Sequence, residues 1–256
     1  MAIGSGDTAA AAFAIGFSDA HQAFESAGTS GVLTFLMDKP QFNPLFMNRC
    51  HVIPGLWIAH GANSMMGGAV DWLRKQIFTE FLDYTVLDDR VKGAVPGAHG
   101  VVFLPYLAGE RCPVWNPRAK AVWYGMTLET SQLDLLESVF EAGAYSMRQI
   151  RDYGEQLLKV SIDSVIAVGN GTKSKHWCQM KSDVLGVTYT TTAFTDAAAY
   201  GAALMGGIAA NIFTGPTDAK ELLENNLSRR LRRRYPIIPL AMELMPADIE
   251  LFKLLL

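Results

Sequence analysis

Apolar and polar residues alternate in short runs through the first half of the chain, a pattern typical of β-strands. Residues 23–37 predict two strands joined through Gly28-Thr29-Ser30-Gly31. Residues 50–60 predict a hairpin that turns at Pro54-Gly55, and the apolar run at residues 101–107 predicts another strand.

Helical spacing of apolar residues dominates the second half of the chain. The longest such pattern, over residues 131–158, places Leu135, Val139, Ala142 and Tyr145 on one side of an amphipathic helix. The other elements are predicted as helices over residues 7–17, 65–78, 175–185 and 197–211, and as strands over residues 161–168 and 187–191. Early strands followed by an αβαβα order predict an α/β fold with a mixed sheet flanked by helices.

The composition is that of a packed globular protein. Of the 256 residues, 50% are hydrophobic and 18% are charged, which suits one large domain or two small ones. The net charge of −3 provides no field that would attract nucleic acid, so no nucleic-acid partner is expected. Cys50, Cys112 and Cys178 lie far apart without metal-binding spacing, which is typical of a reduced, cytoplasmic protein.

Two apolar segments were candidates for a secretion signal or a membrane span. Residues 8–18 are apolar, but no basic residue precedes them, so a signal peptide is not expected. Residues 197–217 carry no charge, but they are built mainly from Ala and Gly rather than Leu, Ile and Phe. A tightly packed helix explains this segment better than a membrane span.

Two glycine-containing loops are the candidate phosphate-binding elements. Gly28-Thr29-Ser30-Gly31 lies between two predicted strands, and Gly169-Asn170-Gly171 follows a strand and precedes a helix. Such loops expose backbone N–H groups that can bind phosphate oxygens. Taken alone, the first loop is better explained by an ordinary hairpin turn, and the second fits a tight strand-to-helix turn equally well.

The second loop departs from two common nucleotide fingerprints. Thr172 separates Gly171 from Lys173-Ser174, so the loop is not a Walker A motif. The spacing Gly169-x-Gly171-x-x-Ser174 partly matches a dinucleotide fingerprint, but the acidic residue expected after the next strand is missing. A NAD-dependent oxidoreductase is therefore disfavoured.

Three charged features have both a structural and a functional interpretation. Asp7 suits the N-cap of the first helix, and a carboxylate there could also accept a proton from an attacking hydroxyl. Glu110-Arg111 lies in the proline-containing segment 109–121, where no regular structure is expected, and is interpreted as an ion pair that orders the loop. The basic run at residues 229–234 is interpreted as a solvated helix end, because no interleaved aromatic residues support nucleic-acid binding.

In combination, these motifs resemble the FGGY carbohydrate kinases, and xylulokinases in particular. The resemblance runs from about Ile3 to about Phe213. The motifs that carry it, in order, are Gly6-Asp7-x-Ala9-Ala10, Gly28-Thr29-Ser30-Gly31, Phe103-Leu104-Pro105-Tyr106-Leu107-x-Gly109-Glu110-Arg111-x-Pro113, Gly169-x-Gly171-x-x-Ser174-x-x-Trp177-x-Gln179-x-x-x-Asp183, and Ala199-x-Gly201-Ala202-Ala203.

The resemblance implies an actin-like, ribonuclease-H-like ATPase fold in which two domains enclose the active site. Residues 1–15 would be the end of the first domain and residues 16–256 the C-terminal nucleotide-binding domain. The N-terminal half, which carries a further phosphate-binding hairpin and the sugar-binding groups, would be missing from this chain. The expected partners are therefore a sugar substrate, that N-terminal half and, through the apolar surface its loss exposes, a second copy of the chain.

The resemblance also implies roles for individual residues, with Asn170 as the main departure from the family pattern. Asn170 stands where the family has a glycine and adds a side chain near the ligand, and Asp196 stands where a glutamate is often seen. Carried over by position, the site consists of the catalytic base Asp7, the phosphate-contacting Gly28, Thr29 and Ser30, and the nucleotide-contacting Gly169, Asn170, Gly171 and Ser174.

The implied reaction is phosphoryl transfer from ATP, assisted by Mg²⁺, to xylulose or a related polyol. A sugar hydroxyl attacks the γ-phosphorus while Asp7 accepts its proton. No dedicated metal-ligand cluster is visible in the sequence, and the isolated chain is expected to show little activity because half a cleft cannot position a sugar. The alternative hypothesis is a non-catalytic nucleotide-binding or assembly module of the actin-like fold.

Overall fold

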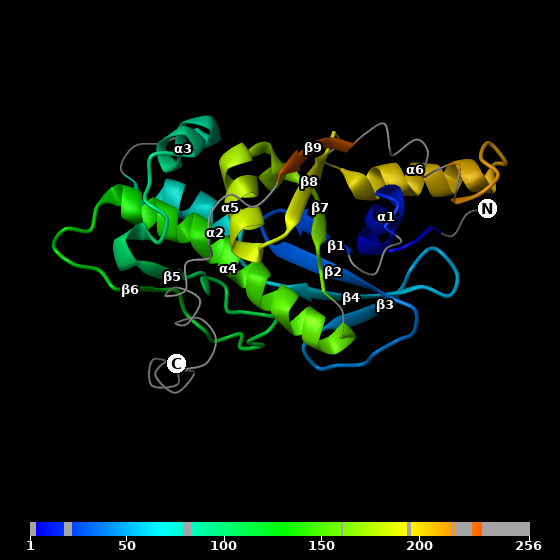
Figure 1. The fold of residues 1–256 in the computed structure, drawn as a ribbon, viewed down its shortest axis with the longest axis horizontal. Helices are drawn as coiled ribbons and strands as arrows, with labels where there is room; N and C mark the ends of the chain where they lie inside the picture. The colour runs from blue at the N-terminus through cyan, green and yellow to red at the C-terminus, as the bar shows by residue number, and fades with distance from the viewer. Residues whose placement is uncertain are drawn as a thin grey trace.

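The structure is a computed structural model of the chain, and it describes residues 4–17, 22–78, 83–159, 161–193, 196–216, 218 and 227–231. A seven-stranded mixed sheet forms its centre, in the order β3-β4-β2-β1-β7-β8-β9 (Figure 1). The strands β1, β7 and β8 are parallel to one another, and the other neighbours are antiparallel. The strands of this sheet are β1 (Gln22–Ala27), β2 (Gly31–Met37), β3 (Met47–Cys50), β4 (Trp57–Ala62), β7 (Ser164–Val168), β8 (Thr188–Thr192) and β9 (Leu227–Leu231).

Helices cover both faces of this sheet (Figure 1). The helices are α1 (Asp7–Ala14), α2 (Gly67–Trp72) with its π-helical continuation η1 (Leu73–Ile77), α3 (Tyr84–Val91), α4 (Gln132–Leu158), α5 (Lys175–Leu185) and α6 (Ala197–Ala209). Two 3₁₀ turns, η2 (Ala98–Gly100) and η3 (Asn170–Lys173), and a separate two-stranded sheet of β5 (Val102–Leu104) and β6 (Val122–Tyr124) complete the described elements.

The two faces of the sheet bury different cores, because side chains alternate along each strand. Val165 of β7 belongs to the larger core, with residues of α2, α4 and α5. The next residue, Ile166, belongs to a second core with residues of α1 and the start of α6. Both faces of β7 are therefore buried, as expected for a central parallel strand.

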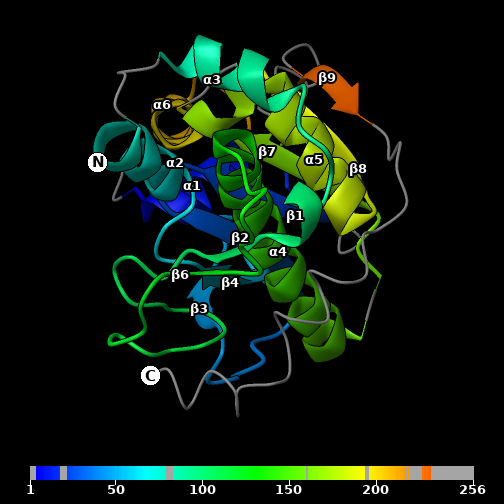
Figure 2. The ribbon, with the colours of Figure 1, turned by 90° about the vertical axis from the view of Figure 1, so that its left-hand side faces the viewer.

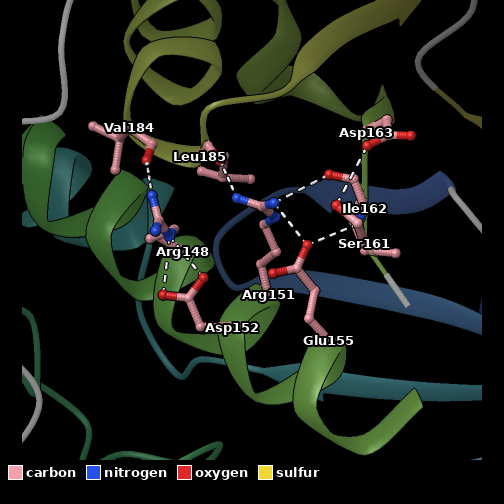
Figure 3. Close-up of polar contacts among 9 residues, drawn as sticks. All are labelled: Arg148, Arg151, Asp152, Glu155, Ser161, Ile162, Asp163, Val184 and Leu185. Carbon is pink, nitrogen blue, oxygen red and sulfur yellow. Dashed lines mark hydrogen bonds and ion pairs between the residues drawn. The ribbon is translucent and has the colours of Figure 1, made fainter. Parts of the chain in front are cut away.

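Helix α4 spans the length of the larger core and is fixed at both ends. A capping box of Ser131 and Asp134 begins it. Near its end, Arg148 and Arg151 donate hydrogen bonds to the carbonyl oxygens of Val184 and Leu185, the last residues of α5 (Figure 3). We call these two arginines, together with Glu155, the α4–α5 clamp.

Glu155 extends the clamp to the segment that leads into β7. Its carboxylate oxygen Oε1 accepts hydrogen bonds from Arg151 at 2.7 Å and from the backbone N–H of Ile162 at 2.7 Å (Figure 3). Arginines at a helix C-terminus satisfy carbonyls that have no partner within the helix. The clamp therefore fixes the C-terminal end of α5, at the opposite end of the helix from Lys175.

Most sequence-based elements are confirmed, including the mixed sheet, the strand pair around residues 28–31, and the helices over residues 131–158 and 175–185. Helix α3 was not predicted. Its N-cap is Asp83, whose carboxylate accepts a hydrogen bond from the N–H of Thr85.

Two interpretations of charged residues were wrong. The N-cap of α1 is Gly6, and Asp7 is the first residue of the helix without a capping hydrogen bond. Residues 229–231 of the basic run belong to strand β9 rather than to a helix end, and residues 232–234 lie outside the described part of the chain.

The predicted ion pair between Glu110 and Arg111 does not form, because each side chain instead bonds to the segment at residues 63–64. Glu110 Oε1 accepts hydrogen bonds from the N–H of Ser64 at 2.6 Å and of Arg111 at 2.7 Å, and the Arg111 guanidinium donates to the Asn63 carbonyl at 2.5 Å. Burial raises the pKa of Glu110. None of the helices in the described part of the chain combines the length and the apolar composition of a membrane span.

Candidate functional site

A cleft of about 790 Å³ opens where the turn after β1 meets the loop after β7. Its walls come from α2, α3 and α5, which surround α4 in Figure 2. The residues that line it include Gly28, Thr29, Gly67 and Gly68 on the first wall, Tyr84 and Asp88 on α3 with Lys92 just after it, and Asn170, Gly171, Lys173, Ser174 and Trp177 on the third wall.

The two glycine loops meet because β1 and β7 are parallel neighbours. Ser26 pairs with Val168, so the residues after both strands emerge at the same edge of the sheet. Gly169 has φ of +98°, and a Cβ there would lie 2.5 Å from the carbonyl oxygen of Ala27. A Cβ on Gly171 would lie 3.0 Å from the Cβ of Ala27. Glycine at both positions therefore lets the second loop pack against the end of β1.

The first turn is bound to the start of α2. The carbonyl oxygen of Thr29 accepts hydrogen bonds from the N–H groups of Met66 at 2.8 Å and Gly68 at 3.0 Å, and that of Gly28 accepts from Gly67 at 3.1 Å. These carbonyls satisfy helix-terminal N–H groups that have no partner within the helix. The turn is thus held as part of the cleft wall rather than as a free hairpin end.

Ser174 joins two walls of the cleft. It is the N-cap of α5, and its hydroxyl oxygen accepts a hydrogen bond from the N–H of Trp177 at 3.0 Å. The same hydroxyl donates to the carboxylate of Asp88 on α3. Ser174 therefore lies in the cleft, with its hydroxyl engaged in these two contacts.

The cleft carries side chains of both charges. Lys92, Lys173 and Lys175 line it together with Asp71 and Asp88. Hydrogen bonds from Arg74, Lys75 and Tyr84 hold the pKa of Asp71 well below its usual range. Within the described part of the chain, no group of three or more His, Cys, Asp or Glu side chains could hold a metal ion.

The predicted site residues divide into two groups. Gly28, Thr29, Asn170, Gly171 and Ser174 line the cleft together. The other three lie elsewhere: Ser30 donates a hydrogen bond to the carbonyl of Ser64 at 3.3 Å, Gly169 packs against Ala27 behind the lining, and Asp7 is exposed at the start of α1.

Sequence reasoning missed the contribution of α3 to the cleft. Tyr84, Thr85, Asp88, Asp89 and Lys92 all come from this helix or the residue that follows it. A signal was present, because Asp83 precedes a helix that buries Leu87 and Val91 at a spacing of one turn.

Comparisons with known proteins show which family the chain belongs to. Residues 23–210 match the FGGY family of carbohydrate kinases, C-terminal domain, so the chain belongs to that family. The xylulose kinase of Escherichia coli (strain K12) is 33% identical over 213 residues, which cover 81% of this chain and 43% of the relative. The gluconokinase of Bacillus subtilis (strain 168) is 26% identical over 241 residues, covering 89% of this chain and 46% of the relative.

The fold is that of solved structures in the same family. A crystal structure of a "xyloylose kinase" from Brucella ovis matches with a TM-score of 0.85 and 27% identity, covering 98% of this chain and 51% of that one. The actin-like fold expected from the sequence is therefore confirmed. The chain spans about half the length of the proteins it matches.

Proposed function

We propose that this chain is the nucleotide-binding half of an ATP-dependent sugar kinase. The observation that carries the proposal is the cleft formed where the turn at residues 28–31 meets the loop at residues 169–171. Its volume of about 790 Å³ lies in the range of small-molecule sites, and its rim carries lysines that suit phosphate groups. A nucleotide therefore fits the residues that are present.

The proposed organisation follows the family pattern. Residues 1–15 end the first kinase domain, and residues 16–256 form the C-terminal domain. The proposed partners are an N-terminal kinase half and a sugar, with a second copy of the chain as a further partner. Xylulose or a related polyol is the proposed acceptor, and the gluconokinase relative makes gluconate the first alternative to test.

The proposed chemistry uses few groups of this chain. Thr29 and the backbone N–H groups of the glycine loops bind the phosphates, and Asp7 accepts the proton of the attacking sugar hydroxyl. Mg²⁺, when bound, supplies positive charge to the phosphate oxygens. Because the described residues form no dedicated metal cluster, we propose that the ion arrives with the nucleotide.

Calorimetry of the chain with Mg-ADP and Mg-ATP tests nucleotide binding, with Mg-GTP and NAD as controls. Thr29→Val should raise the Kd for ADP about tenfold, because it removes one phosphate contact. Thr34→Val is the matched control: this buried hydroxyl has no hydrogen-bond partner among the described residues and does not line the cleft. A folded chain that binds no adenine nucleotide would contradict the proposal and favour the non-catalytic assembly module.

The catalytic part is tested by adding an N-terminal kinase half and measuring ADP release with xylulose and with gluconate. Sugar-dependent release identifies a kinase, and the preferred sugar identifies the acceptor. Nucleotide binding without sugar-dependent release by the paired halves would again favour a non-catalytic module.

A further inference from the structure

A buried charged cluster lies beneath the cleft and takes no part in the contacts described above. The Lys181 ammonium on α5 donates a hydrogen bond to Oε1 of Glu25 on β1. The Tyr189 hydroxyl on β8 donates to Oε2 of the same carboxylate at 2.5 Å. Glu25 and Tyr189 are 0% exposed and Lys181 is 1% exposed. Burial and the Glu25 charge raise the pKa of Tyr189, so its hydroxyl keeps the proton that it donates.

Contacts outside the cluster also hold α5 in the fold. The α4–α5 clamp fixes the C-terminal end of the helix, and Trp177, Val184 and Leu185 of α5 belong to the larger apolar core. An ion pair without solvent often stabilises a protein less than apolar residues of the same volume would. A purely structural explanation of Glu25 and Lys181 is therefore weak.

Lys181 reaches the cleft through Trp177. Its ammonium nitrogen lies 4.6 Å from the centroid of the indole ring, within the range of a cation–π contact. The Trp177 indole N–H donates to the carbonyl oxygen of Phe140 at 2.9 Å, and the two rings meet edge to face at 5.1 Å. Both aromatic residues line the cleft. Gly143 leaves room for the indole, because a Cβ there would lie 2.9 Å from its ring.

Glu25 connects the same cluster to the glycine loops. It lies two residues before Ala27 on β1, so both side chains project from the same face of the sheet. Ala27 is the residue against which Gly169 and Gly171 pack. One carboxylate thus links the strand that supports the phosphate-binding loops to the lysine that supports the aromatic floor.

We propose that Glu25, Lys181 and Tyr189 are positioning residues that hold the Trp177 ring as the floor of the nucleotide cleft and so set the affinity of the cleft for nucleotide. The inference rests on the proposed nucleotide site and adds a specific support for it. The three residues do not touch the nucleotide and act through Trp177.

The test replaces the whole cluster, so that no buried polar group is left without a partner. The variant combines Glu25→Leu, Lys181→Met and Tyr189→Phe, and thermal unfolding checks that it remains folded. The matched control combines Arg151→Met with Glu155→Gln. This change removes an ion pair of α4 that lies against the C-terminal end of α5. The readouts are the Kd for Mg-ADP and the NMR resonance of the Trp177 indole N–H, assigned with Trp177→Phe.

We expect the cluster variant to raise the Kd for ADP about tenfold and to shift the indole resonance of Trp177, because its ring loses a cation–π partner. The control should change neither readout. An unchanged Kd overturns the inference even if the resonance moves, and a lowered affinity with an unmoved resonance overturns the route through Trp177. If the wild-type chain binds no ADP, the proposed function fails. The positioning of the ring is tested separately in that case, because a Trp177 indole resonance that is the same in the wild type and the cluster variant would overturn it.

Discussion

Glu137 on α4 gives the sharpest prediction for stability, because its carboxyl group is buried beside another carboxyl group. It is 3% exposed, and its Oε2 atom has no hydrogen-bond partner among the described residues. Burial, and then the charge of Glu141 one turn later, raise the pKa of Glu137 from 4.5 to about 9. Burial likewise raises the pKa of Glu141 to about 7, although its Oε1 accepts a hydrogen bond from the N–H of Gly97 at 2.6 Å.

The shift makes stability depend on pH with a defined sign. The unfolded chain loses the Glu137 proton near pH 4.5, whereas the folded chain keeps it up to about pH 9. Between these values unfolding releases a proton, so the free energy of unfolding falls as the pH rises. One pKa unit corresponds to about 1.4 kcal/mol, so the cost reaches about 3 kcal/mol at pH 7.

Glu137→Gln should remove this cost, because an amide of the same shape does not ionise. A buried amide carries its own desolvation penalty, so the expected net gain at pH 7 is about 1–2 kcal/mol. The gain should grow towards pH 9 and become small near pH 5. Urea unfolding curves at these three pH values measure it, with the m-value checked for constancy.

Glu129→Gln is the matched control for this measurement. Glu129 is exposed in the loop before α4, so the same substitution there should leave the pH dependence of unfolding unchanged. The reasoning is refuted if wild-type stability does not fall between pH 5 and pH 9. It is equally refuted if Glu137→Gln and Glu129→Gln give parallel curves.

Three further predictions follow from the site and its supports. Asp7→Asn should abolish sugar-dependent ADP release by the paired kinase halves, since the amide cannot accept the proton, and should leave the Kd for ADP within about twofold of the wild-type value. Unchanged turnover would exclude Asp7 as the base. Gly169→Ala should lower the free energy of unfolding, measured by urea titration, by about 1–3 kcal/mol. The backbone there has a φ of +98°, which strains alanine, and the added Cβ would lie 2.5 Å from the carbonyl oxygen of Ala27. Gly201→Ala should separate α6 from α1, since its Cβ would lie 1.9 Å from the Ala10 carbonyl oxygen, and faster amide exchange in α1 would reveal this.

The sequence predicted those parts of the fold that depend on local patterns. Helix α4 was predicted because its apolar spacing continues for many turns. The meeting of the two glycine loops was implied only by the family resemblance. The structure supplies the cause, since β1 and β7 are parallel neighbours whose ends lie at one edge of the sheet. Glycine at residues 169 and 171 was noticed for its possible contact with a ligand, and the structure adds that both positions pack against Ala27.

Other features depend on contacts that no local pattern encodes. Glu25 and Lys181 are 156 positions apart, and each alone resembles an ordinary surface charge. Helix α3 is short and half-exposed, so only Asp83, Leu87 and Val91 indicate it. The N-cap of α1 lies one residue earlier than predicted, at Gly6 instead of Asp7.

Asn170 shows how the structure changes the meaning of a sequence departure. In this loop the residue with a positive φ is Gly169, and the residues that pack against Ala27 are Gly169 and Gly171. Asn170 begins the 3₁₀ turn η3 and is exposed in the cleft. Asparagine adopts positive φ more readily than most residues, but Asn170 does not have a positive φ, so the turn does not depend on that tolerance. A side chain at this position does not disturb the packing of the loop, and its amide offers both donors and an acceptor to whatever the cleft holds. The departure at Asn170 thus bears on the ligand rather than on the fold.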